Sequence, residues 1–252
     1  MKIFKPFLVL FLISAFCLSA SAAGKTHNWY FKQGEKGTRP IVFGGDPMPD
    51  KYGAIYIGNP DEKVIYLTFD AGYGNENLDS ILQTLKAEDV KATFFILPAM
   101  LKYALPSVEK MIEDGHLVAN HTYSHANMAR LSDKGAVEKE LTTLAYYYKE
   151  VTGKEMAPFY RPPEGAFTED TLKYAADLGY TAVFWSFAYA DWDNGKQPDT
   201  TLAKRRIMDS IHNGEVMLLH PNSAANAAVL PEVIKELKAM GYSFRTVDEF
   251  TR

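Results

Sequence analysis

Residues 64–96 read VIYLTFDAGYGNENLDSILQTLKAEDVKATFFI, and this stretch decides the fold class. It begins at residues 64–69 with β-branched and aromatic residues in an unbroken run, which is typical of a buried strand. Apolar residues then recur at helical spacing over residues 78–85, and a second strand-like run follows at residues 92–96. This order predicts two parallel strands joined by a helical crossover.

The same alternation continues to the end of the chain. Further helices are expected around residues 108–112, 135–151, 171–178, 202–211 and 229–240, and further strands at residues 117–119, 159–160, 181–185, 216–219 and 243–244. About seven such units in one domain predict an α/β fold, a closed or nearly closed α/β barrel of about seven strands. An open doubly wound sheet is the alternative.

The first residues have the pattern of a targeting signal. Lys2 and Lys5 precede an apolar run at residues 7–18, and a small-residue cleavage site ends at Ala22. We therefore expect a secretory signal peptide over 1–22, a secreted or cell-envelope protein, and no stable membrane insertion after cleavage. An uncleaved anchor is the alternative. The only cysteine, Cys17, lies inside this segment.

Composition separates the rest of the chain into two parts and excludes one class of partner. Residues 23–61 are rich in Gly, Pro and polar residues and are expected to form an extended lead-in, followed by one domain over 62–252. The 252 residues carry a formal net charge of −4 with a pI of about 5.9. Such a chain has no basic field to hold phosphates, so nucleic-acid binding is not expected. No pattern predicts the oligomeric state.

Polar residues with catalytic potential follow five of the expected strands. They are Asp70 after 64–69, His121 and His125 after 117–119, Arg161 after 159–160, Asp191 and Trp192 after 181–185, and His220 at the end of 216–219. In parallel barrels the active site lies at these carboxyl ends. Each residue also has a structural interpretation: a helix-capping aspartate, solvated histidines, a surface arginine or a core histidine.

The spacing of His121 and His125 favours a metal site. Two imidazoles four residues apart can point at one ion, and histidine is a common zinc ligand. Aromatic residues near the same strand ends, Tyr73, Trp185 and Trp192, offer apolar faces on which a sugar ring can rest.

Five motifs in order carry a resemblance to a known family. They are Thr-Phe-Asp at 68–70, His-x-x-x-His at 121–125, Arg-Pro-Pro-x-Gly at 161–165, Asp-Trp at 191–192 and Leu-x-His at 218–220. From residue 64 onward the chain resembles polysaccharide deacetylases of the NodB homology type, carbohydrate esterase family four. Within that family it is most similar to the delta-lactam-biosynthetic de-N-acetylases, which act on muramic acid residues of peptidoglycan, notably in spore cortex.

The resemblance implies a distorted (β/α) barrel and a divalent metal, usually zinc. His121 and His125 are the implied metal ligands. Asp70 is the implied general base, which draws a proton from metal-bound water, and Arg161 holds that carboxylate ionised and oriented. The implied partner is a glycan strand of peptidoglycan.

The resemblance also assigns the acid side and the substrate contacts. His220 is the implied general acid, and Asp191 sets its tautomer and raises its pKa. A backbone N–H near Glu164 is the implied oxyanion donor. The substrate-binding set comprises Tyr73, Pro163, Glu164, Gly165, Trp185, Trp192 and Leu218.

Two positions depart from the family pattern. Ala71 stands where most members have a second acidic residue that completes a His-His-Asp metal site, and Glu164 stands where an aromatic residue is common. The first hypothesis is an N-deacetylase of N-acetylated peptidoglycan sugars, acting on N-acetylmuramic acid. The alternatives are a deacetylase of chitin-like chains or xylan, and a non-catalytic saccharide-binding protein with a degenerate metal site.

Overall fold

The computed structural model describes residues 24–252, so the expected signal peptide at 1–22 lies outside the described residues. Its central strand is β4 (Val64–Ala71), in which all eight residues are buried. Neighbouring strands cover both edges of β4, and side chains pack on both faces. This double burial explains why its sequence is an apolar run and lacks the alternation of a half-exposed strand.

One parallel sheet of seven strands forms the centre of the molecule. Its strands run in the order β10-β4-β5-β6-β7-β9, and β11 pairs with the first residues of β4. The strands other than β4 are β5 (Thr93–Ile96), β6 (Leu117–Asn120), β7 (Phe159–Tyr160), β9 (Thr181–Ala182), β10 (Glu215–Leu219) and β11 (Ser243–Arg245).

The sheet curls until its two ends meet. Beyond β9 the chain stays hydrogen-bonded to β7, because Val183 N donates to Tyr160 O at 2.8 Å. It then reaches β10, where Phe187 and Met217 form a parallel bridge. The expected barrel-like α/β fold of about seven strands is confirmed, and the open doubly wound alternative is not what forms.

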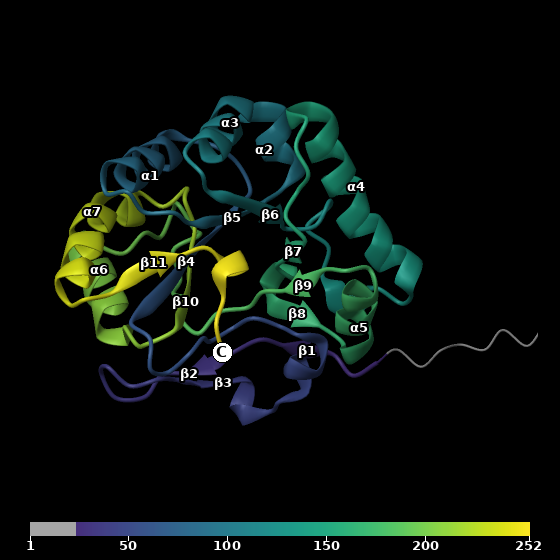
Figure 1. The fold of residues 1–252 in the computed structure, drawn as a ribbon, viewed down its shortest axis with the longest axis horizontal. Helices are drawn as coiled ribbons and strands as arrows, with labels where there is room; N and C mark the ends of the chain where they lie inside the picture. The colour runs from purple at the N-terminus through teal and green to yellow at the C-terminus, as the bar shows by residue number, and fades with distance from the viewer. Residues whose placement is uncertain (1–23) are drawn as a thin grey trace, which may run out of the picture.

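Helices surround the curled sheet on its outside (Figure 1). They are α1 (Glu76–Ala87), α2 (Pro98–Tyr103), α3 (Leu105–Glu113), α4 (Lys134–Thr152), α5 (Glu169–Asp177), α6 (Thr200–Ser210) and α7 (Ala224–Ala239). The short helix α2 was not expected from periodicity; Pro98 occupies its first turn. Helix α7 begins five residues before the expected 229, because the Ser223 side chain caps it by accepting from Asn226 N.

The lead-in packs along the lower edge of the view in Figure 1. Its strand β1 (His27–Asn28) pairs with β8 (Ala166–Phe167), and β2 (Phe31–Lys32) pairs with β3 (Ile41–Val42). Between them, Trp29 stacks on Phe184 with ring centroids 4.2 Å apart. The lead-in therefore shares a hydrophobic cluster with the residues that close the sheet.

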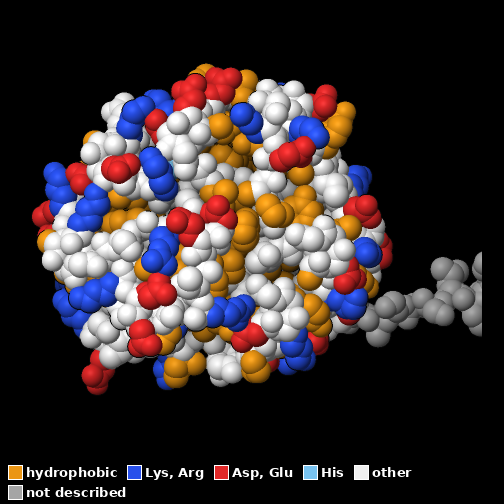
Figure 2. Space-filling view, in the orientation of Figure 1, with side chains coloured by type: hydrophobic (Ala, Val, Ile, Leu, Met, Phe, Trp, Pro, Cys, Tyr) orange, Lys and Arg blue, Asp and Glu red, His pale blue; other side chains and the backbone are white. Residues whose placement is uncertain are grey.

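The surface carries mixed charge. Figure 2 shows Lys and Arg side chains interspersed with Asp and Glu over the face in view. Within residues 24–252, no helix combines the length and the apolar character that crossing a bilayer requires.

Candidate active site

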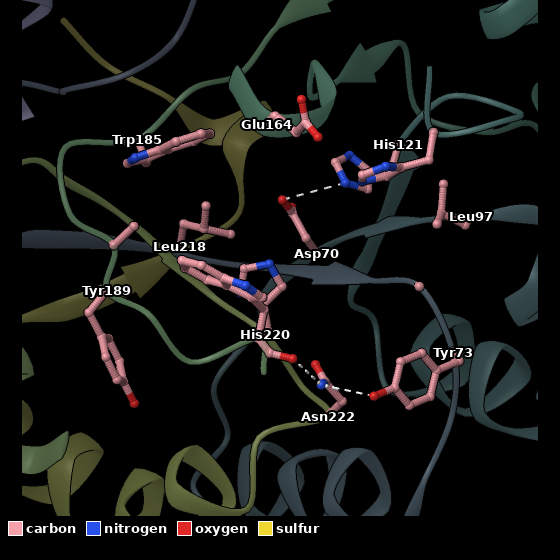
Figure 3. Close-up of a pocket in the computed structure, with 14 residues that line it drawn as sticks. Asp70, Tyr73, Leu97, His121, Glu164, Trp185, Tyr189, Leu218, His220 and Asn222 are labelled. Carbon is pink, nitrogen blue, oxygen red and sulfur yellow. Dashed lines mark hydrogen bonds and ion pairs between the residues drawn. The ribbon is translucent and has the colours of Figure 1, made fainter. Parts of the chain in front are cut away.

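The carboxyl ends of the strands at which the sequence predicted functional residues surround one cleft. Strand β4 supplies Asp70, β6 leads into His121, β7 leads into Arg161 and β10 leads into His220. The cleft has a volume of about 610 Å³. Its lining includes Asp70, Tyr73, His121, His125, Glu164, Trp185, Tyr189, Trp192, Leu218, His220 and Asn222 (Figure 3).

A buried ion pair forms the floor of the cleft. Arg161 Nη1 donates to Asp70 Oδ1 at 2.7 Å, and the Arg161 side chain is fully buried. The other two guanidinium nitrogens are bonded as well, since Nη2 donates to Thr68 Oγ1 at 2.8 Å and Nε donates to Val183 O at 3.1 Å. Burial, the largest single cause, raises the pKa of Asp70, but the charge and hydrogen bond of Arg161 together with the charges of His121 and His220 outweigh it, so the net pKa is lowered. Asp70 is thus held as a carboxylate.

His121 is oriented by the backbone next to it. Its Nδ1 lies 3.0 Å from the carbonyl oxygen of Arg161, which places the ring proton on Nδ1 in the neutral tautomer. Its Nε2 then carries a lone pair and faces Asp70 Oδ2 at 3.7 Å. Burial, the largest cause, lowers the pKa of His121 to about 4, so this ring is neutral at physiological pH.

His125 reaches the same end of the cleft through an unusual backbone. Its φ of 55° lies in the left-handed region, where a non-glycine residue is strained. The two imidazole rings lie 5.0 Å apart between centroids. A metal-ligating histidine usually donates its other ring N–H to a carbonyl or carboxylate. In His121, Nδ1 makes such a bond and Nε2 is the nitrogen left for an ion. The donor set therefore fits a divalent ion.

Few protein groups are placed to hold such an ion. Among the described residues, no group of three or more His, Cys, Asp or Glu side chains is placed to hold an ion. Ala71, where the family usually has an acidic residue, is fully buried in the sheet and carries no donor atom. A divalent ion held here would have two imidazole donors, one fewer than the three protein ligands that a catalytic zinc normally has.

On the opposite wall, His220 is held by a second buried carboxylate. Asp191 Oδ1 accepts from His220 Nδ1 at 2.8 Å, and Oδ2 accepts from His220 N at 2.8 Å. Asn226 Nδ2 also donates to Asp191 Oδ2, at 2.6 Å. Burial, the largest single cause, lowers the pKa of His220, but the hydrogen bond and charge of Asp191 together with the charge of Asp70 outweigh it, so the net pKa is raised. Its Nε2 is left to face the cleft.

The mouth of the cleft is built from exposed aromatics held by amides. Tyr73 is 48% exposed and Trp192 is 58% exposed. Asn222 Nδ2 donates to Tyr73 Oη at 3.0 Å and to Trp192 O at 3.2 Å, which ties the two loops together (Figure 3). The exposed ring faces suit the stacking of a sugar.

The remaining expected substrate residues divide into two groups. Trp185, Leu218 and Glu164 line the cleft. Pro163 and Gly165 are buried and do not line it. A Cβ on Gly165 would lie 2.7 Å from Trp29 Cβ, so this glycine allows the lead-in to pack beneath the cleft.

Comparison with known proteins agrees with this geometry. Residues 57–183 match the family model described as polysaccharide deacetylase. The chain is 35% identical over 224 residues to the peptidoglycan-N-acetylmuramic acid deacetylase PdaA of Bacillus subtilis, covering 88% of this chain and 84% of PdaA. The chain belongs to the polysaccharide deacetylase family. The family and the hydrolase class expected from the five motifs are confirmed.

Relatives within the polysaccharide deacetylase family differ in substrate and activity. The solved structure of PdaA, a family 4 carbohydrate esterase, has a TM-score of 0.85 at 34% identity, covering 90% of this chain and 97% of PdaA. A peptidoglycan-N-acetylglucosamine deacetylase of Bacillus cereus is 32% identical over 79% of this chain and 72% of its own length. A pseudoenzyme of the family from Bacillus anthracis has a TM-score of 0.72 at 30% identity, covering 79% of this chain and 68% of that protein.

Several site residues of this polysaccharide deacetylase escaped sequence reasoning. Thr68 accepts a hydrogen bond from Arg161, and Tyr189 lines the cleft. Asn222 donates to Tyr73 at the mouth of the cleft, and Asn226 donates to Asp191. Of these residues, only Asn222 could have been noticed in the sequence, because it lies two residues after His220. Asn226 lies in the first turn of α7, and nothing in its sequence surroundings marks it as a partner of Asp191.

Three histidines lie outside the cleft. His27, in the lead-in, packs against the rings of Phe43 and Phe167. His116 is buried, and its Nδ1 accepts from Ala92 N. His212 is buried too, with Nε2 2.9 Å from Ser186 Oγ.

Proposed function

We propose that this polysaccharide deacetylase is an N-deacetylase of peptidoglycan, and that it hydrolyses the acetamide of N-acetylmuramic acid. The observation that carries the proposal is a pair of facing systems in one cleft, Asp70 held by Arg161 and His220 held by Asp191. The likeness to a deacetylase of N-acetylmuramic acid supports the choice of sugar. Hydrolysis converts the acetamide and water to acetate and a free amine.

Asp70 acts as the general base of this reaction. The Arg161 bond occupies Oδ1, while Oδ2 faces the cleft beside His121 Nε2. A water molecule between substrate and Asp70 gives its proton to Oδ2 as its oxygen attacks the acetamide carbon. General base catalysis of this kind contributes about 10²–10⁴-fold.

His121 and His125 would hold a divalent ion, zinc in the first instance, beside Asp70. Such an ion lowers the pKa of water toward about 7 and polarises a carbonyl oxygen. Deacetylases of this family are in general metal-dependent. The backbone N–H near Glu164, whose φ of 58° turns the chain sharply at the cleft, is the proposed second donor to the oxyanion.

His220 acts as the general acid. An amine is a poor leaving group, so its nitrogen must be protonated as the C–N bond breaks. Asp191 fixes the proton on Nδ1 and raises the pKa of the ring, so protonated His220 can donate from Nε2. The ring faces of Trp185 and Trp192 hold the sugar between the two systems.

The product explains the wider role that we propose. Deacetylated muramic acid carries the free amine from which a muramic δ-lactam is built, in spore cortex. Peptidoglycan lies outside the cytoplasmic membrane, and the expected signal peptide at 1–22 would bring the enzyme there.

One assay tests this function. Purified mature protein is incubated with oligosaccharides of N-acetylmuramic acid and N-acetylglucosamine, chitin oligomers and acetylated xylan, with and without added zinc, and acetate is followed by mass spectrometry. We expect acetate from the muramic acid oligomers, with more after zinc addition. Acetate release from chitin oligomers or xylan only would show that the proposed substrate is wrong and that one of these polymers is the substrate.

A second candidate function is a saccharide-binding protein without catalysis. The observation that favours it is the absence, among the described residues, of a third metal-ligating side chain. It predicts oligosaccharide binding by calorimetry with no acetate release at any zinc concentration.

A further inference from the structure

A second cavity of about 340 Å³ adjoins the catalytic cleft. Ala188 and Tyr189 line both this cavity and the cleft, so these two residues form a wall between them. In Figure 3 Tyr189 lies at the edge of the cleft, and its ring extends away from Asp70. We call this space the side cavity; its lining includes Phe31, Gln33, Tyr189, Arg205, Arg206 and Asp209.

The side cavity is cationic. Arg205 and Arg206 both line it, and neither forms an ion pair with any residue in the described part of the chain. The one carboxylate in the lining, Asp209, is already paired with Lys36 at 2.6 Å. Two guanidinium groups therefore remain for a ligand, and guanidinium is the side chain best suited to carboxylate.

The lead-in adds an unused amide. Both polar atoms of the Gln33 side-chain amide are buried, and neither has a hydrogen-bond partner among residues 24–252. Buried amides are nearly always bonded, because an unpaired donor or acceptor keeps its full desolvation cost. A ligand in the side cavity would supply the missing partner.

The catalytic cleft has the opposite character. Its described lining contains Asp70 and Glu164 but no lysine or arginine, since Arg161 lies beneath the surface and is fully buried. A neutral acetamide suits that cleft, whereas a carboxylate of the same polymer suits the side cavity. An acetylated polymer with carboxylates at intervals can fill both at once.

We propose that the side cavity is an accessory subsite for a carboxylate of the substrate chain, bound by Arg205, Arg206 and the Gln33 amide. This inference rests on the proposed function, because peptidoglycan supplies the carboxylate. Two sources share the chemistry: the lactyl group of a neighbouring muramic acid, and a stem peptide. The Tyr189 ring, 5.9 Å from the Arg206 guanidinium carbon, is the apolar surface over which the chain passes from cleft to subsite.

The first test compares acid and ester substrates. Wild type and the double variant Arg205→Gln, Arg206→Gln are assayed on a muramic acid oligomer and on its methyl ester. We expect the acid-to-ester ratio of kcat/KM to fall about 10-fold in the variant, through KM, because charge-assisted hydrogen bonds are lost. The double variant Lys139→Gln, Lys154→Gln, which also removes two positive charges, at exposed positions in α4 and just after it, should keep the wild-type ratio.

A second pair of substrates separates the two sources. One oligomer has free lactyl carboxylates, and the other has lactyl groups capped by stem peptides; each is compared with its own ester. The source is the oligomer whose ratio falls in the arginine variant. Gln33→Leu, which removes the amide and keeps the volume similar, should lower the same ratio by a smaller factor.

Binding without turnover keeps this test independent of the proposed function. Calorimetry uses the same acid and ester oligomers with Asp70→Asn, alone and combined with the two arginine changes, so that no acetate is released during the titration. Acetate release with equal acid-to-ester ratios in wild type and the arginine variant overturns the subsite and leaves the function standing. If no oligomer releases acetate, the proposed function fails, and equal calorimetric affinity for acid and ester then overturns the subsite as well.

Discussion

On one wall of the cleft, His220 receives two contacts from Asp191, and Asn226 holds that carboxylate in turn. On the other wall, the rings of His121 and His125 lie 5.0 Å apart between centroids, but Ala71 adds no third donor to them. In the proposed mechanism the chain itself completes the acid wall around His220, whereas an ion on the metal wall would have only His121 and His125 as protein ligands. Substitutions on the two walls should therefore differ in their effects on metal content and on the pH profile of kcat.

The largest effect is expected for Asp70→Asn. The amide keeps the shape and accepts from Arg161, but it cannot take a proton from water at neutral pH. We expect kcat to fall by about 10³–10⁴-fold, at the upper end of general base catalysis. Because Arg161 is fully buried, the free energy of unfolding should also fall, by about 3 kcal/mol. Acetate release measures kcat, and a thermal melt measures the loss of stability. Loss of a general base costs at least roughly 10²-fold, so a variant that keeps more than about a tenth of the wild-type rate would rule out this role for Asp70.

His220→Ala should break the acid wall and leave the metal wall intact. Loss of the general acid should lower kcat by about 10²–10³-fold, because the amine must then leave unassisted. Zinc content, measured by atomic emission, should match wild type. His121→Ala is the matched comparison and should lose both activity and zinc. A large zinc loss in His220→Ala would mean that this histidine is a ligand.

Ala71→Asp is designed to complete the metal wall. A carboxylate there adds a ligand and a negative charge, so the Kd for zinc should fall. We expect a fall of about 10²-fold, the upper end of the change in metal affinity that single substitutions around metal sites produce. Wild type should correspondingly be purified partly metal-free and gain activity when zinc is added. Calorimetric titration of zinc into both proteins measures the difference. Equal affinities would mean that another group, such as the loop at 74–77, already completes the site.

The smallest change is expected from Asp191→Asn, and it appears mainly in the pH profile. The pKa of His220 is raised by Asp191, so removing that charge lowers it. Activity needs protonated His220, which is lost as pH rises through its pKa. The basic limb of kcat should therefore move to lower pH, with a loss of about 10-fold near neutrality. An unchanged limb would show that another group sets it.

Sequence patterns located much of this fold because its central strands are buried on both faces. Val64–Ala71 and Glu215–Leu219 are wholly buried, so their apolar runs were visible without any structure. The short helix Pro98–Tyr103 and the early start of Ala224–Ala239 were missed. Their apolar residues do not recur over enough turns to produce a period, and their starts depend on Pro98 and on a cap at Ser223.

The chain alone determined which residue types reach the site. Asp70, Arg161 and His220 stand directly at or after strand ends, and parallel strands bring such positions to one edge whatever the details of packing. Tertiary structure decided how these residues are held and what lies next to them. The bond from Asn226 to Asp191 and the side cavity between Gln33 and Arg206 join segments far apart in sequence. No local pattern encodes such contacts, because they form only when the curled sheet brings α6, α7 and the lead-in against its end.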